Sequence, residues 1–265
     1  MKKWLLPLAI GLALSGTASA QDAPAAAPAP AAAPAPAAAP ATLPAAIAAA
    51  IADPGRGDDA QVDARRHGGE ILAFAGVKPG DKVLELLPGG GYFTRILSKV
   101  VGADGKVYAE MPSEIANVDR FKAVTDAYPN VALLRDPAAA PVTPESVDVA
   151  FTSQNYHDYP TPYLGNTDVA AVDRSIFSAL KPGGIYIVID HVAEAGSDTR
   201  DADTLHRIDP AFVRSQVEAA GFEFAGESDV LRNPADDHTL KVFDKTIRGH
   251  TDQFVYKFRK PRATD

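Results

Sequence analysis

A short apolar run that ends at three consecutive glycines constrains the fold of this chain more than any other feature. Residues 82–87 are rich in Val and Leu, glycines follow at 89–91, and residues 92–101 show the apolar spacing of an amphipathic helix. Strand, glycine turn and helix in this order form the first part of a crossover connection between parallel strands. The sequence therefore predicts an α/β fold.

The same alternation continues to the end of the chain. We expect strands at residues 82–87, 106–110, 131–134, 146–152, 185–190, 222–230 and 253–258, and helices at 92–101, 117–127, 168–180 and 209–220. Two strands follow the last helix with only a loop between them, so the final strand should run antiparallel to its neighbours. The predicted architecture is a doubly wound, seven-stranded, mostly parallel sheet whose last strand is antiparallel.

The first fifty residues differ in composition from the rest of the chain. Lys2 and Lys3, the apolar run from Trp4 to Leu14 and the small residues that end at Ala20 have the order of a secretory signal. In residues 21–50, 25 of 30 residues are Ala or Pro, and recurrent proline favours an extended spacer. We expect a signal peptide at 1–20, a linker at 21–50 and a folded domain at 51–265, located in the periplasm or secreted.

Charge and hydropathy limit the partners that we expect. The formal net charge is −8, and loss of Lys2 and Lys3 with the signal leaves 24 basic against 34 acidic residues, or −10. An acidic body repels phosphate backbones, so we expect no nucleic-acid partner. The apolar run near the N-terminus has about half of the roughly 20 residues that a membrane-spanning helix needs, so we expect no integral span after cleavage.

The glycine turn and two acidic residues form the predicted ligand site. Gly89, Gly90 and Gly91 let a ligand approach the main chain, or else form a tight strand-to-helix turn. Glu85 lies within a strand that should be buried, so we expect it to pair with a ligand group or with loop N–H groups. Glu110 ends the second strand, where an acid accepts hydrogen bonds from both ribose hydroxyls; a solvated loop acid is the alternative.

These acids lead to two further expectations. The carboxylates of Glu85 and Glu110 should open onto one cleft above the glycines. Asp136, after the third strand, is a candidate for the adenine edge of a nucleoside and equally a plain turn residue.

Several blocks of the sequence resemble class I S-adenosylmethionine-dependent methyltransferases, and more narrowly a group of exported bacterial proteins known only as predicted methyltransferases. The blocks are residues 72–74, 85–92, 155–158, 180–184, 206–209, 231–234, 248–249 and 254–261. The resemblance implies S-adenosylmethionine as cofactor, with Glu85, Gly89 and Gly91 at its methionine and ribose parts and Glu110 at the ribose. The chain departs from the family motif at Leu87, where the motif has its first glycine, and at Pro88.

The segment after the fourth strand is where we expect chemistry. Asn155 follows that strand and is a candidate to hold the cofactor's amino group or a polar atom of the substrate. His157 is a candidate general base, oriented by Asp158 or a backbone carbonyl, because its unperturbed pKa is near 6.5. The alternative is a loop histidine that only supports the shape of the segment.

Two other segments with charged residues are candidates for a role. Asp190 and His191 end the fifth strand but lack a further carboxylate at a fitting distance, so the sequence predicts no metal ligands. Arg207 is expected either to bind an anionic substrate group or to form a brace with Asp209.

The favoured function is methyl transfer from S-adenosylmethionine to a small molecule or an envelope component, with His157 pointing into a pocket beside the methyl group. The alternative is a non-catalytic periplasmic binding module of the same fold that senses an adenosyl-type metabolite. A nicotinamide-dependent oxidoreductase is disfavoured by Glu85 within the first strand and by the reversed final strand.

Overall fold

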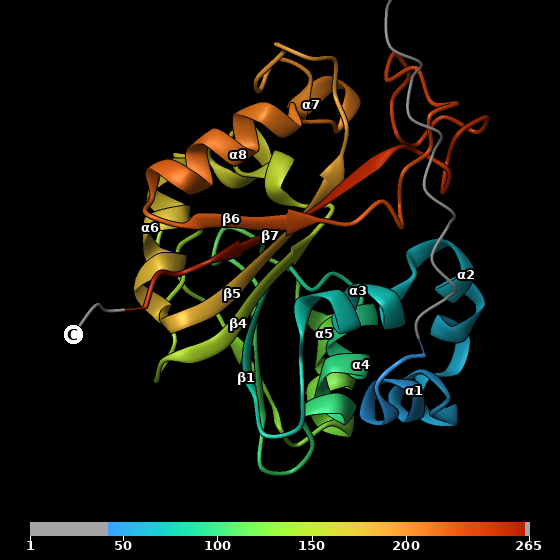
Figure 1. Cartoon of the computed structure of the whole chain (residues 1–265), viewed down its shortest axis with the longest axis vertical. Helices are drawn as coiled ribbons and strands as arrows, with labels where there is room; N and C mark the ends of the chain where they lie inside the picture. Colours follow the sequence, from blue (N-terminus) through green and yellow to red (C-terminus); the bar gives the residue numbers. More distant parts are fainter. Residues whose placement is uncertain (1–41, 263–265) are drawn as a thin grey trace, which may run out of the picture. The chain divides into compact units, whose positions relative to one another are not determined.

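The computed structural model describes residues 42–262, which form a seven-stranded sheet in the order β3-β2-β1-β4-β5-β7-β6 (Figure 1). The predicted signal peptide, residues 1–20, and most of the predicted linker lie outside the described residues. The strands are β1 (Lys82–Leu86), β2 (Lys106–Glu110), β3 (Val131–Leu134), β4 (Val147–Ser153), β5 (Leu180–His191), β6 (Glu223–Glu227) and β7 (Gln253–Arg259).

The direction of the strands matches the prediction. Strands β1 to β5 pair in parallel, whereas β7 is antiparallel to both β5 and β6. The predicted fold class is therefore confirmed. Strand β7 lies between β5 and β6, although it is the last strand in the sequence.

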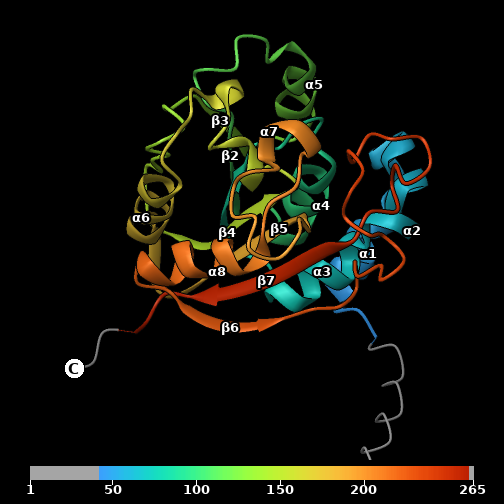
Figure 2. The same ribbon diagram turned by 90° about the horizontal axis from the view of Figure 1, so that it is seen from above.

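Helices cover both faces of the sheet because successive strand residues point to opposite sides (Figures 1 and 2). On one face, α1 (Ala45–Ile51), α3 (Gly68–Ala75), α4 (Tyr92–Val101) and α5 (Asp119–Ala127) pack on a core that includes Val83 and Ala109. On the other face, α6 (Val169–Ala179) and α8 (Pro210–Ala219) pack on a core that includes Leu84 and Tyr108.

The N-terminal helices were not predicted, and one of them corrects the boundary of the linker. We expected residues 21–50 to be an extended spacer, but α1 follows Pro44 directly, and its Ile47 and Ala50 are 1% and 2% exposed. Alanine is the strongest helix former, so the tract becomes helical once its prolines end. The 3-10 segment η1 (Pro54–Val62) and the short helix α2 (Asp63–Arg66) then lead to α3.

The connection from β6 to β7, residues 228–252, contains no helix or strand. It lies beside α2 in both overall views (Figures 1 and 2). Among residues 42–262, no helix combines the length and apolar character that crossing a bilayer requires.

Candidate functional site

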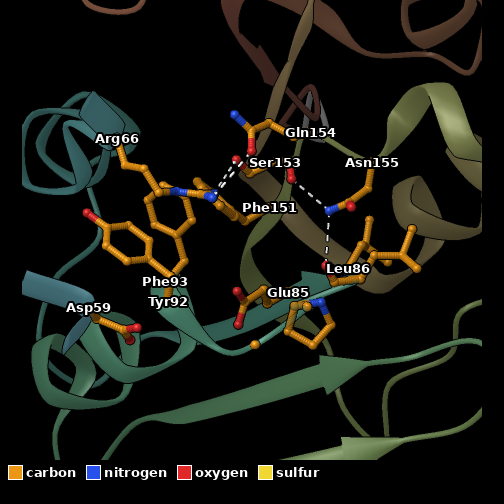
Figure 3. Close-up of a pocket in the computed structure, with 14 residues that line it drawn as sticks. Asp59, Arg66, Glu85, Leu86, Tyr92, Phe93, Phe151, Ser153, Gln154 and Asn155 are labelled. Carbon is orange, nitrogen blue, oxygen red and sulfur yellow. Dashed lines mark hydrogen bonds between the residues drawn. The ribbon is translucent and has the colours of Figure 1, made fainter. Parts of the chain in front are cut away.

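A pocket lies at the carboxyl end of β1, where the glycine turn begins (Figure 3). Its walls come from β1, the turn, the start of α4, the end of β4, η1 and α2. The charged residues that line it are Asp59, Arg66 and Glu85; the other lining residues are Leu86, Leu87, Pro88, Gly89, Gly90, Tyr92, Phe93, Phe151, Ser153, Gln154 and Asn155. We call this the β1 pocket.

The three glycines of the turn have different structural roles. A Cβ atom built on Gly89 or Gly90 would meet nothing within 4 Å, and both residues line the β1 pocket. Gly91 is the N-cap of α4, and a Cβ atom there would lie 2.8 Å from a side-chain carbon of Val124. Gly89 and Gly90 therefore leave space for a ligand, whereas Gly91 lets α4 pack closely against α5.

Leu87 has a backbone conformation that is usual for glycine. Its φ is +50°, in the left-handed region that side chains other than glycine rarely adopt. Its amide donates a 2.8 Å hydrogen bond to the carbonyl oxygen of Glu110. Leu87 thus combines a glycine-like backbone with a larger side chain at the turn.

Glu85 is buried, at 2% exposure, and has a partner on one oxygen. The hydroxyl of Thr94, in the first turn of α4, donates to its Oε2 over 2.6 Å. Burial raises the pKa of Glu85 to about 7, while the Thr94 hydrogen bond and the charge of Arg66 act in the opposite direction. This carboxyl group therefore changes its charge near neutral pH.

Glu110 does not share a cleft with Glu85, so that expectation was wrong. In the β1–β2 register Glu85 is paired with Ala109 and Leu86 with Glu110, which sends the two carboxylates to opposite faces of the sheet. Glu110 is 1% exposed, and no atom of residues 42–262 forms a hydrogen bond with its Oε1. Burial, with the nearby charge of Asp136 next, raises the pKa of Glu110 to about 8.

A second pocket lies on the far side of the turn and shares Leu87, Gly89 and Asn155 with the β1 pocket. Its other walls combine apolar and aromatic residues with polar and charged ones: Met111, Ile115, Val118, Phe121 and Tyr163, and Asn117, Arg120 and Asp158. We call it the β2 pocket. Asn155 separates the two pockets, and its Nδ2 donates to the carbonyl oxygens of Leu87 and Ser153 over 3.0 and 2.7 Å.

Asp136 lines neither pocket. Its Oδ2 accepts a hydrogen bond from the amide of Val142 over 3.2 Å, which closes the loop after β3. This contact is that of a turn residue.

His157 is buried and is oriented by Asp190, not by Asp158 or a backbone carbonyl as we expected. Its Nδ1 lies 2.8 Å from Asp190 Oδ1, and its backbone amide donates to Asp190 Oδ2 over 2.8 Å. Burial lowers the pKa of His157, but the charge and hydrogen bond of Asp190 outweigh it and the pKa is raised. The ring lines neither pocket, so the expectation that it points into one was wrong.

Arg207 forms a structural brace, but with a different partner from the one expected. It is fully buried and binds both carboxylate oxygens of Asp236, over 2.9 and 3.0 Å. Asp209 instead caps α8 by accepting from the amide of Ala211. Arg207 therefore fixes the 228–252 connection to the sheet and is not available to a substrate.

A third pocket shares Arg66 and Gln154 with the β1 pocket. Arg65, Arg66 and Arg248 line it together with Gln154, His191, Val242, Phe243, Gly249, Thr251 and Gln253, and none of these residues is acidic. Three guanidinium groups make this arginine pocket suited to an anion.

Comparisons with known proteins agree with this architecture. The chain is 28% identical over 177 residues to a ubiquinone/menaquinone biosynthesis C-methyltransferase of Cronobacter sakazakii, covering 63% of this chain and 66% of that protein. It is 29% identical over 175 residues to the protein of the same name from Yersinia pestis, covering 63% and 65%. The chain thus spans slightly less than two thirds of these curated relatives, and no family model matches it.

Solved structures are similar over a larger part of the chain. A SAM-dependent methyltransferase from Aquifex aeolicus superposes with a TM-score of 0.52 at 18% identity, over 73% of this chain and 89% of that one. The N-methyltransferase NodS from Bradyrhizobium japonicum gives 0.54 at 11%, over 77% and 99%. The chain has the class I methyltransferase fold.

The methyltransferase fold does not by itself fix the reaction. The [4+2]-cyclase SpnF superposes with a TM-score of 0.57 at 16% identity, over 75% of this chain and 81% of that one. The activity of this chain is therefore determined by the side chains of its pockets.

Sequence reasoning missed the part of this methyltransferase fold that precedes β1. Asp59 and Arg66 supply two of the three charged groups of the β1 pocket, and they come from a stretch in which we predicted no element. A cluster of charged residues at 56–66 was the available signal, but no motif connected it with the glycine turn.

Proposed function

We propose that this chain is an S-adenosylmethionine-dependent methyltransferase that acts, after export, on a small molecule or an envelope component. The observation that carries the proposal is the charge arrangement of the β1 pocket, where Asp59 and Glu85 lie with Arg66 around open glycine backbone. The curated relatives support it because they are named as methyltransferases.

The charges of the β1 pocket complement the amino-acid part of S-adenosylmethionine. That part carries an ammonium, a sulfonium and a carboxylate, so it needs negative groups for the first two and a positive group for the third. Glu85 and Asp59 are the negative groups, although Asp59 is also paired with Arg95 over 2.8 Å. Arg66 is the positive group, and a guanidinium binds a carboxylate with two parallel hydrogen bonds.

Arg66 is held in place for this role from two sides (Figure 3). Its guanidinium stacks over the rings of Tyr92 and Phe93, 4.8 and 5.1 Å from their centroids. Its NH2 and NH1 nitrogens donate to the side-chain oxygens of Ser153 and Gln154 over 3.2 and 3.3 Å. Both contacts hold the Arg66 side chain in place before a ligand binds, so less side-chain entropy is lost on binding.

Glu110 and the β2 pocket fit the nucleoside part. Glu110 Oε1 has no hydrogen-bond partner among residues 42–262 and is the kind of acceptor that ribose hydroxyls require. Glu110 itself lines neither pocket, but the next residue, Met111, lines the β2 pocket. Ile115, Val118 and Phe121 would give an adenine ring an apolar surface. When bound, the cofactor supplies a methyl group that is already activated, so the protein's part is to align the acceptor and exclude water.

The arginine pocket supports an acceptor that carries an anionic group. It adjoins the β1 pocket through Arg66, and Arg65 and Arg248 add positive charge within a protein whose net charge is −8. Val242 and Phe243 provide an apolar wall beside these charges. An acidic small molecule with an apolar portion matches this lining.

Calorimetric titration of the purified chain with S-adenosylmethionine and S-adenosylhomocysteine tests cofactor binding. We expect both to bind, and we expect Glu110→Ala and Arg66→Met to weaken both, with Glu114→Gln as an exposed acidic control. Absence of binding to the wild type at millimolar ligand would overturn the proposal.

Transfer of a labelled methyl group to an envelope extract tests turnover. We expect label in acceptors retained by an anion-exchange resin, and about tenfold less of it with Arg248→Met, the loss of one charged contact. Label confined to neutral acceptors would contradict the anionic acceptor. Cofactor binding without any transfer would instead support the non-catalytic binding module.

A further inference from the structure

Two imidazoles and one carboxylate converge at the carboxyl end of β4, outside the β1 pocket. His157 and Asp158 belong to the 3-10 segment η2 (Tyr156–Asp158), and His206 follows the short helix α7 (Ala202–Leu205). His157 Nε2 lies 3.2 Å from His206 Nδ1 and 3.4 Å from Asp158 Oδ1, and the last two atoms are 4.0 Å apart.

We propose that His157, Asp158 and His206 bind one divalent transition-metal ion, with Zn²⁺ as the reference ion. Ligands at the usual 2.0–2.1 Å from a tetrahedral zinc ion lie about 3.3–3.4 Å from one another. Two of the three separations are within about 0.2 Å of this value, and the third needs a shift of less than 1 Å. Three ligand atoms of suitable type are therefore already arranged around one point.

Asp190 supports this arrangement from behind. Its Oδ1 lies 2.8 Å from Nδ1 of His157, so the Nδ1–H donates to the carboxylate and the lone pair of Nε2 points to the cluster. Asp190 is itself fixed by the backbone amides of His157 and His191, over 2.8 and 2.7 Å. A carboxylate that orients the far nitrogen of a histidine is the usual second layer of a metal site.

The charges of the cluster also favour a divalent cation. Two neutral imidazoles with the carboxylates of Asp158 and Asp190 carry a formal charge of −2, which one M²⁺ ion neutralises. Two nitrogen ligands disfavour Mg²⁺ and Ca²⁺, which prefer oxygen, and favour Zn²⁺, Co²⁺ or Ni²⁺. The competing explanation is a hydrogen bond between the two imidazoles, which involves no ion.

One side of the cluster is open. The side chains of His206 and Asp158 are 28% and 16% exposed, against 4% for His157. Three protein ligands with an accessible fourth position is the pattern of catalytic zinc sites, whereas structural sites are closed by four. Asp158 also lines the β2 pocket with Leu87, Gly89 and Asn155, so the ion would lie at the edge of the proposed active site.

A role in catalysis rests on the proposed function, although ion binding itself does not. An oxygen of the acceptor at the fourth position would be held beside the cofactor and would lose its proton more easily than in water. His157 would then serve as a ligand and not as a general base.

The test is a titration of the chelator-treated chain with Co²⁺ and Zn²⁺, followed by absorption and by metal content after desalting. We expect one ion per chain and Co²⁺ bands typical of four-coordination. Asp158→Asn, which keeps the size of the side chain, and His206→Ala, which is partly exposed, should each weaken Zn²⁺ binding at least tenfold. His250→Ala removes an exposed histidine outside the cluster and should bind like the wild type.

Two outcomes would overturn the metal site. One is the absence of saturable Zn²⁺ binding by the wild type, which would leave only the imidazole–imidazole hydrogen bond. The other is equal affinity in the wild type, Asp158→Asn and His206→Ala, which would place the ion elsewhere. Titration of the metal-free chain with S-adenosylmethionine reports separately on the proposed function.

Discussion

Glu85 and Glu110 are buried carboxyl groups on neighbouring strands, but they differ in how the protein satisfies them. Glu85 accepts a hydrogen bond from the hydroxyl of Thr94 and lies near the charge of Arg66, and its pKa is raised to about 7. Glu110 has an oxygen without a partner among residues 42–262, and its pKa is raised to about 8. The comparison shows that Glu85 has one hydrogen-bond partner within residues 42–262 and borders a pocket, whereas Glu110 Oε1 is buried without a partner among those residues.

The largest expected effect is on cofactor affinity. Glu110→Ala should weaken S-adenosylmethionine binding about 100-fold, because two hydrogen bonds from the ribose hydroxyls, each worth about 1.5 kcal/mol, are lost. Glu85→Gln should weaken it about tenfold, because the amide retains one oxygen for Thr94 and only the charge is removed. Calorimetry measures both, and the reverse order would break the distinction between the two acids.

The next effect is on the pH dependence of stability without ligand. Both pKa values are raised above the ordinary glutamate value, so the folded state holds these protons more tightly than the unfolded state does. The resulting stability is fully present below about pH 4.5 and is lost as the pH rises through 7 for Glu85 and 8 for Glu110.

Urea unfolding at pH 6 and pH 8 measures this loss. Over that interval the wild type should lose about 2 kcal/mol through Glu110 and about 1 kcal/mol through Glu85. Glu110→Gln should therefore flatten the pH dependence more than Glu85→Gln does. Equal slopes in the wild type and Glu110→Gln would mean that the carboxyl of Glu110 finds a partner in solution.

The smallest effect concerns Leu87, whose amide connects the turn after Glu85 to the backbone of Glu110. Because its φ is +50°, Leu87→Gly should be more stable than Leu87→Ala by about 1 kcal/mol. Leu86, in the regular part of β1, is the matched control, and there Gly should be less stable than Ala. Thermal unfolding distinguishes the two orders, and the same order at both positions would contradict strain at Leu87.

The sequence was sufficient to predict the strands of the sheet but not the arrangement of side chains in the site. Short apolar runs separated by amphipathic helices predicted every strand, because buried parallel strands must be apolar. The register of the strands was harder to predict. The face of the sheet on which Glu110 lies depends on its pairing with Leu86, and a shift by one residue would have placed Glu110 on the other face.

Contacts between distant residues were the main omission. Asp190 orients His157 from 33 residues away, because β4 and β5 are adjacent and both end at this edge of the sheet. The predicted topology implied that β4 and β5 are adjacent, so the contact between Asp190 and His157 could have been predicted. The position of Arg66 could not be predicted in this way, because it depends on packing against the rings of Tyr92 and Phe93, which no sequence periodicity reveals.

The insertion of β7 between β5 and β6 has a consequence for biosynthesis. Both neighbours are synthesised before the residues that hydrogen-bond to them, so the two edges stay unpaired until the C-terminal segment has left the ribosome. Exposed strand edges invite association between nascent chains and recognition by chaperones. A polypeptide truncated before residue 253 would retain this open seam permanently, and premature termination should yield aggregates or proteolysis instead of a smaller folded protein.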